Sequence, residues 1–100
     1  MRRFQITIPE DAVKEMCRRY YVRELALFGS VLGPDFGPGS DVDVLVEFEP
    51  DAPIGFLAFA GLQNELSELL GRQVDLVPKA GLKRRIRKPV LDSAQVIYER

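Results

Sequence analysis

Two aspartates at the start of a predicted strand are the first residues of this chain that could do chemistry. Asp41 and Asp43 open the segment Asp41–Phe48, in which apolar and polar residues alternate. Residues two apart on a strand share a face, so the bases of these two side chains lie roughly 7 Å apart. Carboxylates placed like this repel each other unless a cation compensates them, and Mg²⁺ is the usual cation because it prefers oxygen ligands. The pattern is also compatible with the solvated face of an ordinary amphipathic strand.

A third carboxylate, Asp75, stands inside the apolar segment Val74-Asp75-Leu76-Val77. An ionised carboxylate in a buried strand is costly unless it is paired or ligates a metal. If this strand lies beside Asp41–Phe48, three carboxylates meet on one face, an arrangement that suits two-metal phosphoryl or nucleotidyl transfer. The alternative for Asp75 is an ion pair with an arginine of the helical layer. Glu47 shares the face of Asp43 but lies beyond Leu45, further from such a site.

Gly29-Ser30 follows directly on the predicted buried strand Val22–Phe28. A glycine allows close approach and unusual backbone angles, so backbone amides and the serine hydroxyl can reach a phosphate at such a turn. By itself a Gly-Ser step is an ordinary turn. It gains meaning here because it stands just upstream of Ser40-Asp41-Val42-Asp43.

Together these segments resemble a known signature. Phe28-Gly29-Ser30, followed ten residues later by the stretch from Ser40 to Phe48, is similar to the signature of the DNA polymerase beta-like nucleotidyltransferase superfamily. The stretch from Glu65 to Val77 stands where that family places its third carboxylate, and the short length resembles its minimal nucleotidyltransferase branch.

The resemblance implies roles for individual residues. Asp41, Asp43 and Asp75 would be the catalytic and metal-binding residues, holding Mg²⁺ and through it ATP or another nucleoside triphosphate. Gly29, Ser30 and Ser40 would bind the nucleotide. Members of the minimal branch often act as antitoxins of a HEPN-type helical toxin, and some transfer AMP from ATP to a toxin tyrosine. The resemblance therefore implies an adenylyltransferase with a HEPN-type protein partner. One departure is that Gly33-Pro34 stand where many relatives carry an arginine.

Composition excludes several other chemistries. The chain has no histidine and a single cysteine, Cys17, so a Ser/His/Asp triad, a histidine-ligated zinc site and an intrachain disulfide are ruled out. Cys17 lies on an apolar helical stripe and is expected to be a core thiol. The net charge of −1 argues neither for nor against a nucleic-acid partner. The basic residues are concentrated in a window at residues 79–88. No apolar signal region or membrane-length run is found, which predicts a cytoplasmic protein without membrane contact.

The pattern of elements predicts one domain over residues 1–100, of α/β (α+β) class, with a small mixed sheet flanked by helices. Strands are expected at Phe4–Ile8, Val22–Phe28, Asp41–Phe48, Gln73–Val77 and Gln95–Tyr98. Helices are expected after Pro9, over Ile54–Leu70 with a stop at Gly71, and over 81–88, where Pro89 interrupts the basic segment before another turn at 90–94.

Three functions compete. The first is Mg²⁺-dependent nucleotide transfer to an acceptor hydroxyl, for which the three aspartates argue. The second is a catalytically weak antitoxin that neutralises its partner by binding alone, which the missing arginine favours. Direct binding of nucleic acid ranks last, because the basic window has no interleaved aromatic residues to stack on bases.

Overall fold

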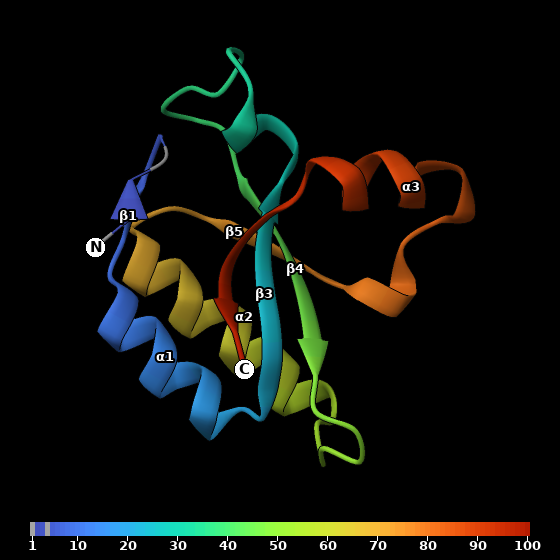
Figure 1. Ribbon diagram of the computed structural model, residues 1–100. Helices are drawn as coiled ribbons and strands as arrows, with labels where there is room; N and C mark the ends of the chain where they lie inside the picture. Colours follow the sequence, from blue (N-terminus) through green and yellow to red (C-terminus); the bar gives the residue numbers. More distant parts are fainter. Residues whose placement is uncertain (1, 4) are drawn as a thin grey trace.

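The computed structural model describes residues 2–3 and 5–100, in which one four-stranded sheet has helices on both faces (Figure 1). The strand order is β5-β4-β3-β6, with β4 and β5 parallel and the other neighbours antiparallel. This mixed sheet confirms the predicted fold class. The strands are β3 (Val22–Phe28), β4 (Val42–Phe48), β5 (Val74–Pro78) and β6 (Gln95–Glu99). The helices are α1 (Glu10–Arg19), α2 (Phe56–Leu70) and α3 (Arg84–Ser93). The short elements are β1 (Arg2–Arg3), β2 (Thr7–Ile8) and the 3₁₀ turns η1 (Gly29–Leu32) and η2 (Lys79–Gly81).

The main core lies on the face that α1 and α2 cover. Val13, Met16 and Cys17 of α1 are buried at helical spacing, as are Leu62 and Leu66 of α2. The sheet contributes the buried side chains Leu25, Leu27, Val42, Val44 and Val46. Gly71 ends α2 with a φ of +67°, a left-handed angle that glycine adopts without a side-chain penalty. Burial of these apolar stripes supplies most of the stability of the fold.

The opposite face, which α3 partly covers, is organised in three rows across the strands. The carboxylate row contains Phe28, Asp43 and Asp75, which are paired in register from β3 through β4 to β5. Below it the apolar row contains Ala26, Leu45 and Val77, and the ion-pair row contains Glu24 and Glu47. Val90 of α3 and the flanking residues Leu82 and Ala94 pack on the apolar row. This packing leaves the carboxylate row accessible beside α3.

Most predicted elements are confirmed within a residue or two. The strand Val22–Phe28 is confirmed, β4 begins one residue later than expected at Val42, and β6 is an edge strand. The prediction of a helix over Ile54–Leu70 is confirmed with a start at Phe56.

Two element predictions need correction. Only Thr7–Ile8 of the predicted strand Phe4–Ile8 pairs, with β1, while Phe4 lies outside the described residues. The basic helix starts later than expected, at Arg84, and runs through Pro89 to Ser93. Pro89 stands in the second turn, where it removes one backbone hydrogen bond from a helix that is exposed along most of its length. Over the described residues, no helix combines the length and apolar character that crossing a membrane requires.

Candidate active site

Asp43 and Asp75 are directly opposite each other on the parallel strands β4 and β5. Their side chains therefore leave the same face of the sheet, beside α3. Asp41 stands two residues before Asp43, just ahead of β4, and is exposed. The structure thus brings the three predicted carboxylates to one end of one sheet face.

Gly29 makes room for the carboxylate of Asp43. The φ of Gly29 is +75°, and a Cβ built on it would lie 2.3 Å from Oδ2 and 3.2 Å from Cγ of Asp43. Any side chain at position 29 would therefore collide with that carboxylate. The glycine turn and Asp43 are therefore close neighbours.

The surroundings of Asp43 disfavour its negative charge. Burial raises the pKa of Asp43, and the charges of Asp75 and Asp41 raise it further. Within residues 2–3 and 5–100, no ion pair is recorded for any of the three aspartates. No ion pair among the described side chains therefore compensates the negative charge of these aspartates.

The expectation that Asp75 is a buried carboxylate is wrong. Asp75 is exposed, because β5 is an edge strand and α3 packs over Val77 rather than over the carboxylate row. The alternative for Asp75 was an ion pair with an arginine of the helical layer. That ion pair is also absent among the described residues. Its position in register with Asp43, and not its burial, relates Asp75 to the site.

The residue types fit a hard cation such as Mg²⁺, which takes oxygen ligands. In the part of the chain that the structure describes, however, no group of three histidine, cysteine, aspartate or glutamate side chains is arranged to hold one metal ion. The carboxylates share a face and repel one another, yet they do not form a ready-made cage. Binding of an ion would require side-chain rotation at the exposed positions Asp41 and Asp75.

Ser30 and Ser40, both predicted to bind nucleotide, differ in their surroundings. Ser30 lies in η1, next to Gly29, and is exposed. The hydroxyl of Ser40 accepts a hydrogen bond from the Gly37 amide at 3.0 Å, and the Ser40 amide donates to the Gly37 carbonyl at 3.0 Å. Ser40 therefore closes the loop that precedes Asp41. Nucleotide binding by Gly29, Ser30 and Ser40 stays a prediction.

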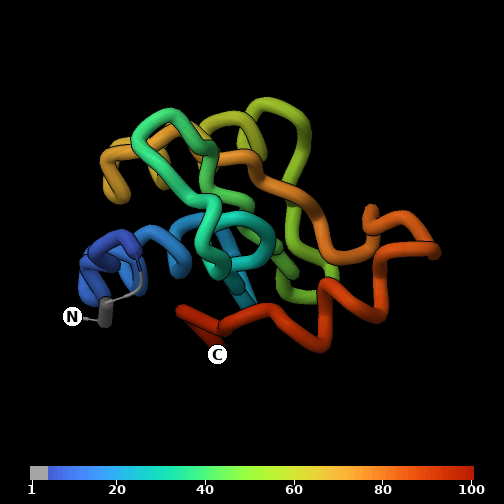
Figure 2. Tube along the Cα trace, turned by 90° about the horizontal axis from the view of Figure 1, so that it is seen from above, coloured from blue at the N-terminus to red at the C-terminus, as the bar shows by residue number. Residues whose placement is uncertain are grey.

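Arg72 fixes the same loop and was not anticipated from the sequence. Its Nη2 donates to the carbonyls of Gly37 and Ser40, the second at 2.8 Å. Its guanidinium carbon lies 4.4 Å from the centre of the Phe36 ring. Figure 2 shows the loop of residues 33–40 (green) running beside the end of α2 and the start of β5. No local pattern around Arg72 reveals partners that lie more than thirty residues away.

Two hollows open beside the carboxylate row. The α3 hollow has a volume of about 320 Å³ and is lined by Phe28, Asp43, Asp75, Val77, Lys83 and Ile86, among others. The glycine-turn hollow has a volume of about 450 Å³ and includes Gly29, Leu32, Gly33, Val90 and again Phe28 and Ile86. Phe28 and Ile86 therefore form the boundary between the two hollows.

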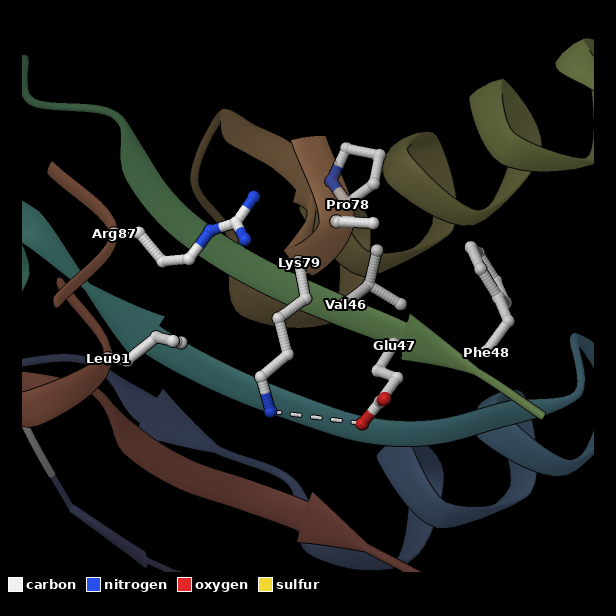
Figure 3. A pocket seen from close by; sticks show the side chains of 8 residues that line it. Val46, Glu47, Phe48, Pro78, Lys79, Arg87 and Leu91 are labelled. Carbon is white, nitrogen blue, oxygen red and sulfur yellow. Dashed lines mark ion pairs between the residues drawn. The ribbon is translucent and has the colours of Figure 1, made fainter. Parts of the chain in front are cut away.

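Glu47 belongs to a separate cluster in the ion-pair row. Nζ of Lys79 lies 2.8 Å from Oε1 of Glu24. It also lies 3.8 Å from Oε1 of Glu47, the ion pair drawn in Figure 3. The hydrogen bond to Glu24 raises the pKa of Lys79. The pocket in Figure 3 has a volume of about 450 Å³ and contains none of the three aspartates. Glu47, four residues beyond Asp43, thus shares Lys79 with Glu24 and takes no part in the candidate site.

The basic window is divided by these contacts. Lys79 is paired in the ion-pair row, Arg87 donates to the Leu82 carbonyl at 3.1 Å, and Lys88 pairs with Asp92 at 2.8 Å. Lys83 instead lines the α3 hollow together with Asp43 and Asp75. The window is therefore neither a uniform patch nor remote from the carboxylates.

Comparisons of the sequence and of the structure with known proteins both match nucleotidyltransferases. The family model for the nucleotidyltransferase domain matches residues 10–97. The protein adenylyltransferase MntA of Thermococcus cleftensis is 45% identical over 85 residues, which cover 85% of this chain and 82% of that protein. A solved structure provisionally described as a minimal nucleotidyltransferase has a TM-score of 0.70 at 38% identity, with 85% of each chain covered.

A more distant solved structure matches as well. It is the tri-AMPylated Shewanella oneidensis HEPN toxin in complex with the MNT antitoxin, with a TM-score of 0.62 at 20% identity, covering 91% of this chain and 70% of the other. At that identity the similarity concerns the fold alone.

Proposed function

Because the chain belongs to the nucleotidyltransferase domain family, we propose that it transfers a nucleotide, AMP from ATP, to an acceptor hydroxyl. The observation that carries this proposal is the carboxylate row. Asp43 lies against Gly29 on one side and in register with Asp75 on the other, and burial together with neighbouring negative charge raises its pKa. A cation would compensate the negative charge of the aspartates, and a polyphosphate would lie against the backbone at Gly29.

Asp41, Asp43 and Asp75 are the residues that would hold Mg²⁺. When bound, the ion supplies positive charge to the phosphates and to the acceptor oxygen. The exposed backbone at Gly29 and the exposed hydroxyl of Ser30 would receive the phosphates. Asp75, which lies in register with Asp43 on the neighbouring strand, would take the proton of the acceptor hydroxyl.

We further propose that the acceptor belongs to a HEPN-type helical toxin, so that the protein acts as an antitoxin in the cytoplasm. The similarity to a protein adenylyltransferase at 45% identity supports AMP as the transferred group. The distant fold relative that was solved with an AMPylated HEPN toxin supports the class of partner. A site exposed on one face of a small sheet suits an acceptor that another protein presents.

The second candidate function is neutralisation by binding alone. Residues 31–40 contain no basic side chain, and Arg72, which lies beside this loop, already donates to the Gly37 and Ser40 carbonyls. A nucleotide would therefore find little positive charge near the glycine turn. Weak turnover combined with tight complex formation would follow if no other cation takes part.

Labelled ATP, Mg²⁺ and a cognate HEPN-type protein distinguish the two functions. We expect label on the partner, and we expect Asp41→Asn and Asp43→Asn to abolish it. Glu47→Gln is the matched control, because Glu47 shares the strand and face of Asp43 but pairs with Lys79 at 3.8 Å. If both asparagine variants still inhibit the partner and no label forms with the unchanged protein, binding alone is the function.

A further inference from the structure

Arg72 stands between α2 and β5, in a segment whose backbone is fixed by α2. Its amide donates to the Ser67 carbonyl at 3.2 Å, one of the hydrogen bonds that close the end of α2. Two residues later, the Val74 amide donates to the hydroxyl of the same serine at 3.0 Å. The side chain of Arg72 therefore projects from a backbone that the helix keeps in place.

Asp75 belongs to the same fixed segment. The amides on either side of it, those of Val74 and Leu76, donate to side-chain oxygens of Ser67 and Gln63, each at 3.0 Å. These side chains of α2 take the place of a partner strand, because β5 is at the edge of the sheet and has only β4 beside it. The backbone that carries Asp75 is thus fixed by β4 on one side and by α2 on the other.

The side chain of Arg72 extends from this segment to the loop of residues 33–40. One guanidinium nitrogen donates to the carbonyls of Gly37 and Ser40. The plane of the group lies over the Phe36 ring, with 4.4 Å between the guanidinium carbon and the ring centre. A planar guanidinium can donate to two acceptors and stack on a ring at the same time, which an ammonium group cannot do.

Asp41 lies between two peptide groups that the same segment fixes. The carbonyl of the Ser40–Asp41 peptide accepts the hydrogen bond from Arg72 at 2.8 Å. The amide of the Asp41–Val42 peptide donates to the Gln73 carbonyl at 2.9 Å. Because a residue has only two soft backbone dihedrals, restraining both flanking peptides restrains the direction in which its side chain leaves the backbone.

This restraint matters because Asp41 has little other support. It precedes β4, its side chain is exposed, and no ion pair is recorded for it among the described residues. Its charge nevertheless raises the pKa of Asp43, so the two carboxylates are close enough to act on one cation. Consecutive residues 72 and 73 therefore set the backbone of Asp41 relative to the strand that carries Asp75.

We propose that Arg72 is a positioning residue for the candidate metal site: by fixing the Ser40–Asp41 peptide, it keeps the Asp41 carboxylate where it can share a divalent cation with Asp43. This inference rests on the proposed function, in which the aspartates hold the ion. Arg72 does not contact the ion. With Arg72 in place, only the side chain of Asp41 has to rotate when an ion binds. Without it, the backbone of Asp41 has to be ordered as well, which costs free energy.

Metal binding by the intact protein tests this inference without any transfer. The probe is Mn²⁺, which like Mg²⁺ prefers oxygen ligands and whose free ion is measured directly by electron paramagnetic resonance. Arg72→Lys keeps the charge and loses the fork of donors. Phe36→Leu is a milder variant that removes the ring and neither hydrogen bond. Arg85→Lys is the matched control, because Arg85 is exposed on α3.

We expect Arg72→Lys to weaken Mn²⁺ binding about tenfold, which corresponds to about 1.4 kcal/mol for ordering the backbone of one residue. Phe36→Leu should weaken it about threefold, because the guanidinium loses its contact with the ring. Arg85→Lys should stay within about twofold of the unchanged protein. Circular dichroism at the temperature of the binding measurement shows which variants are folded, and Phe36→Leu decides the test if Arg72→Lys is not.

A second measurement distinguishes positioning of Asp41 from a general contribution to stability. In ¹⁵N relaxation without metal, the amide order parameter of Asp41 should fall from about 0.85 to below about 0.6 in Arg72→Lys, while that of Asp43 stays unchanged. An unchanged order parameter at Asp41 would overturn the inference. A lower order parameter with unchanged Mn²⁺ affinity would also overturn it, since Arg72 would then order the loop without affecting the metal site.

The inference and the proposed function can fail separately. If Mn²⁺ binding depends on Arg72 while no acceptor is ever modified, the proposed transfer fails and the positioning role stands. If transfer occurs and folded Arg72→Lys binds Mn²⁺ as tightly as the unchanged protein, the positioning role is wrong and the proposed function stands. An unchanged protein that binds no Mn²⁺ would contradict the positioning role as well.

Discussion

Replacing Gly29 by alanine tests the contact on which the candidate site depends. Gly29 has a φ of +75°, and its added Cβ would lie 2.3 Å from Oδ2 of Asp43. Gly71 is a natural control, because its φ is +67° and a Cβ there would meet no atom within 4 Å. The two substitutions share the backbone penalty, and only Gly29→Ala adds a collision.

The size of each loss follows from these two components. A left-handed angle costs a non-glycine residue about 1–2 kcal/mol, so Gly71→Ala should lower the free energy of unfolding by about that amount. In Gly29→Ala the Asp43 carboxylate must also rotate away, which adds about 0.5–1.5 kcal/mol for a side chain off its preferred rotamer. Transfer should fall about 100-fold in Gly29→Ala, the effect of misplacing a reacting group by about 1 Å. It should change little in Gly71→Ala.

Urea unfolding of both variants, alone and combined with Asp43→Ala, measures the collision directly. Without the carboxylate, the nearest Asp43 atom to the added Cβ is Cβ itself at 3.4 Å, so the extra loss in Gly29→Ala should disappear. A loss that persists unchanged in the Asp43→Ala background would refute this reasoning. So would equal stability losses at positions 29 and 71 with unimpaired transfer in both.

Three further predictions concern charge and burial. Because the folded state raises the pKa of Asp43, the stability this group contributes is present below its unfolded pKa of about 3.9 and is lost as the pH rises through the higher folded value. Asp43→Asn should therefore raise Tm at pH 7 and not at pH 3, and thermal melts that show the same difference at both pH values would contradict this. Arg72→Lys should cost about 1–2 kcal/mol and expose residues 33–40 to proteolysis, because an ammonium group cannot both stack on Phe36 and span two carbonyls. Unchanged urea midpoint and cleavage pattern would exclude that role. Burial raises the pKa of the Cys17 thiol to about 12, so a thiol reagent at pH 8 should label it only after unfolding, and rapid labelling of the native protein would disprove the burial.

The sequence was sufficient for elements whose signal is local. Alternation over 41–48 predicted β4, and leucine spacing with Gly71 predicted α2 and its end. The corrections concern properties that depend on distant partners. Asp75 is exposed because β5 lies at the edge of the sheet, and strand order is not encoded in the composition of one strand.

The candidate site was predictable in its residues but not in its surroundings. Motif spacing identified Gly29, Asp41, Asp43 and Asp75, and the register of β4 with β5 then placed Asp43 against Asp75. The hydrogen bonds from Arg72 to the loop of residues 33–40 depend on how α2 packs. The position of Lys83 in the α3 hollow depends on how α3 packs. Such long-range contacts leave no periodic pattern in the sequence.

The division of the sheet into two faces also bears on how this chain can change over generations. The main core is built from α1, α2 and one face of β3 and β4, whereas α3 contains no buried residue. Substitutions along α3 therefore leave the main core intact. Mutational drift in that helix is the least disruptive route by which a descendant could come to recognise a different partner while it keeps the aspartates and the glycine turn.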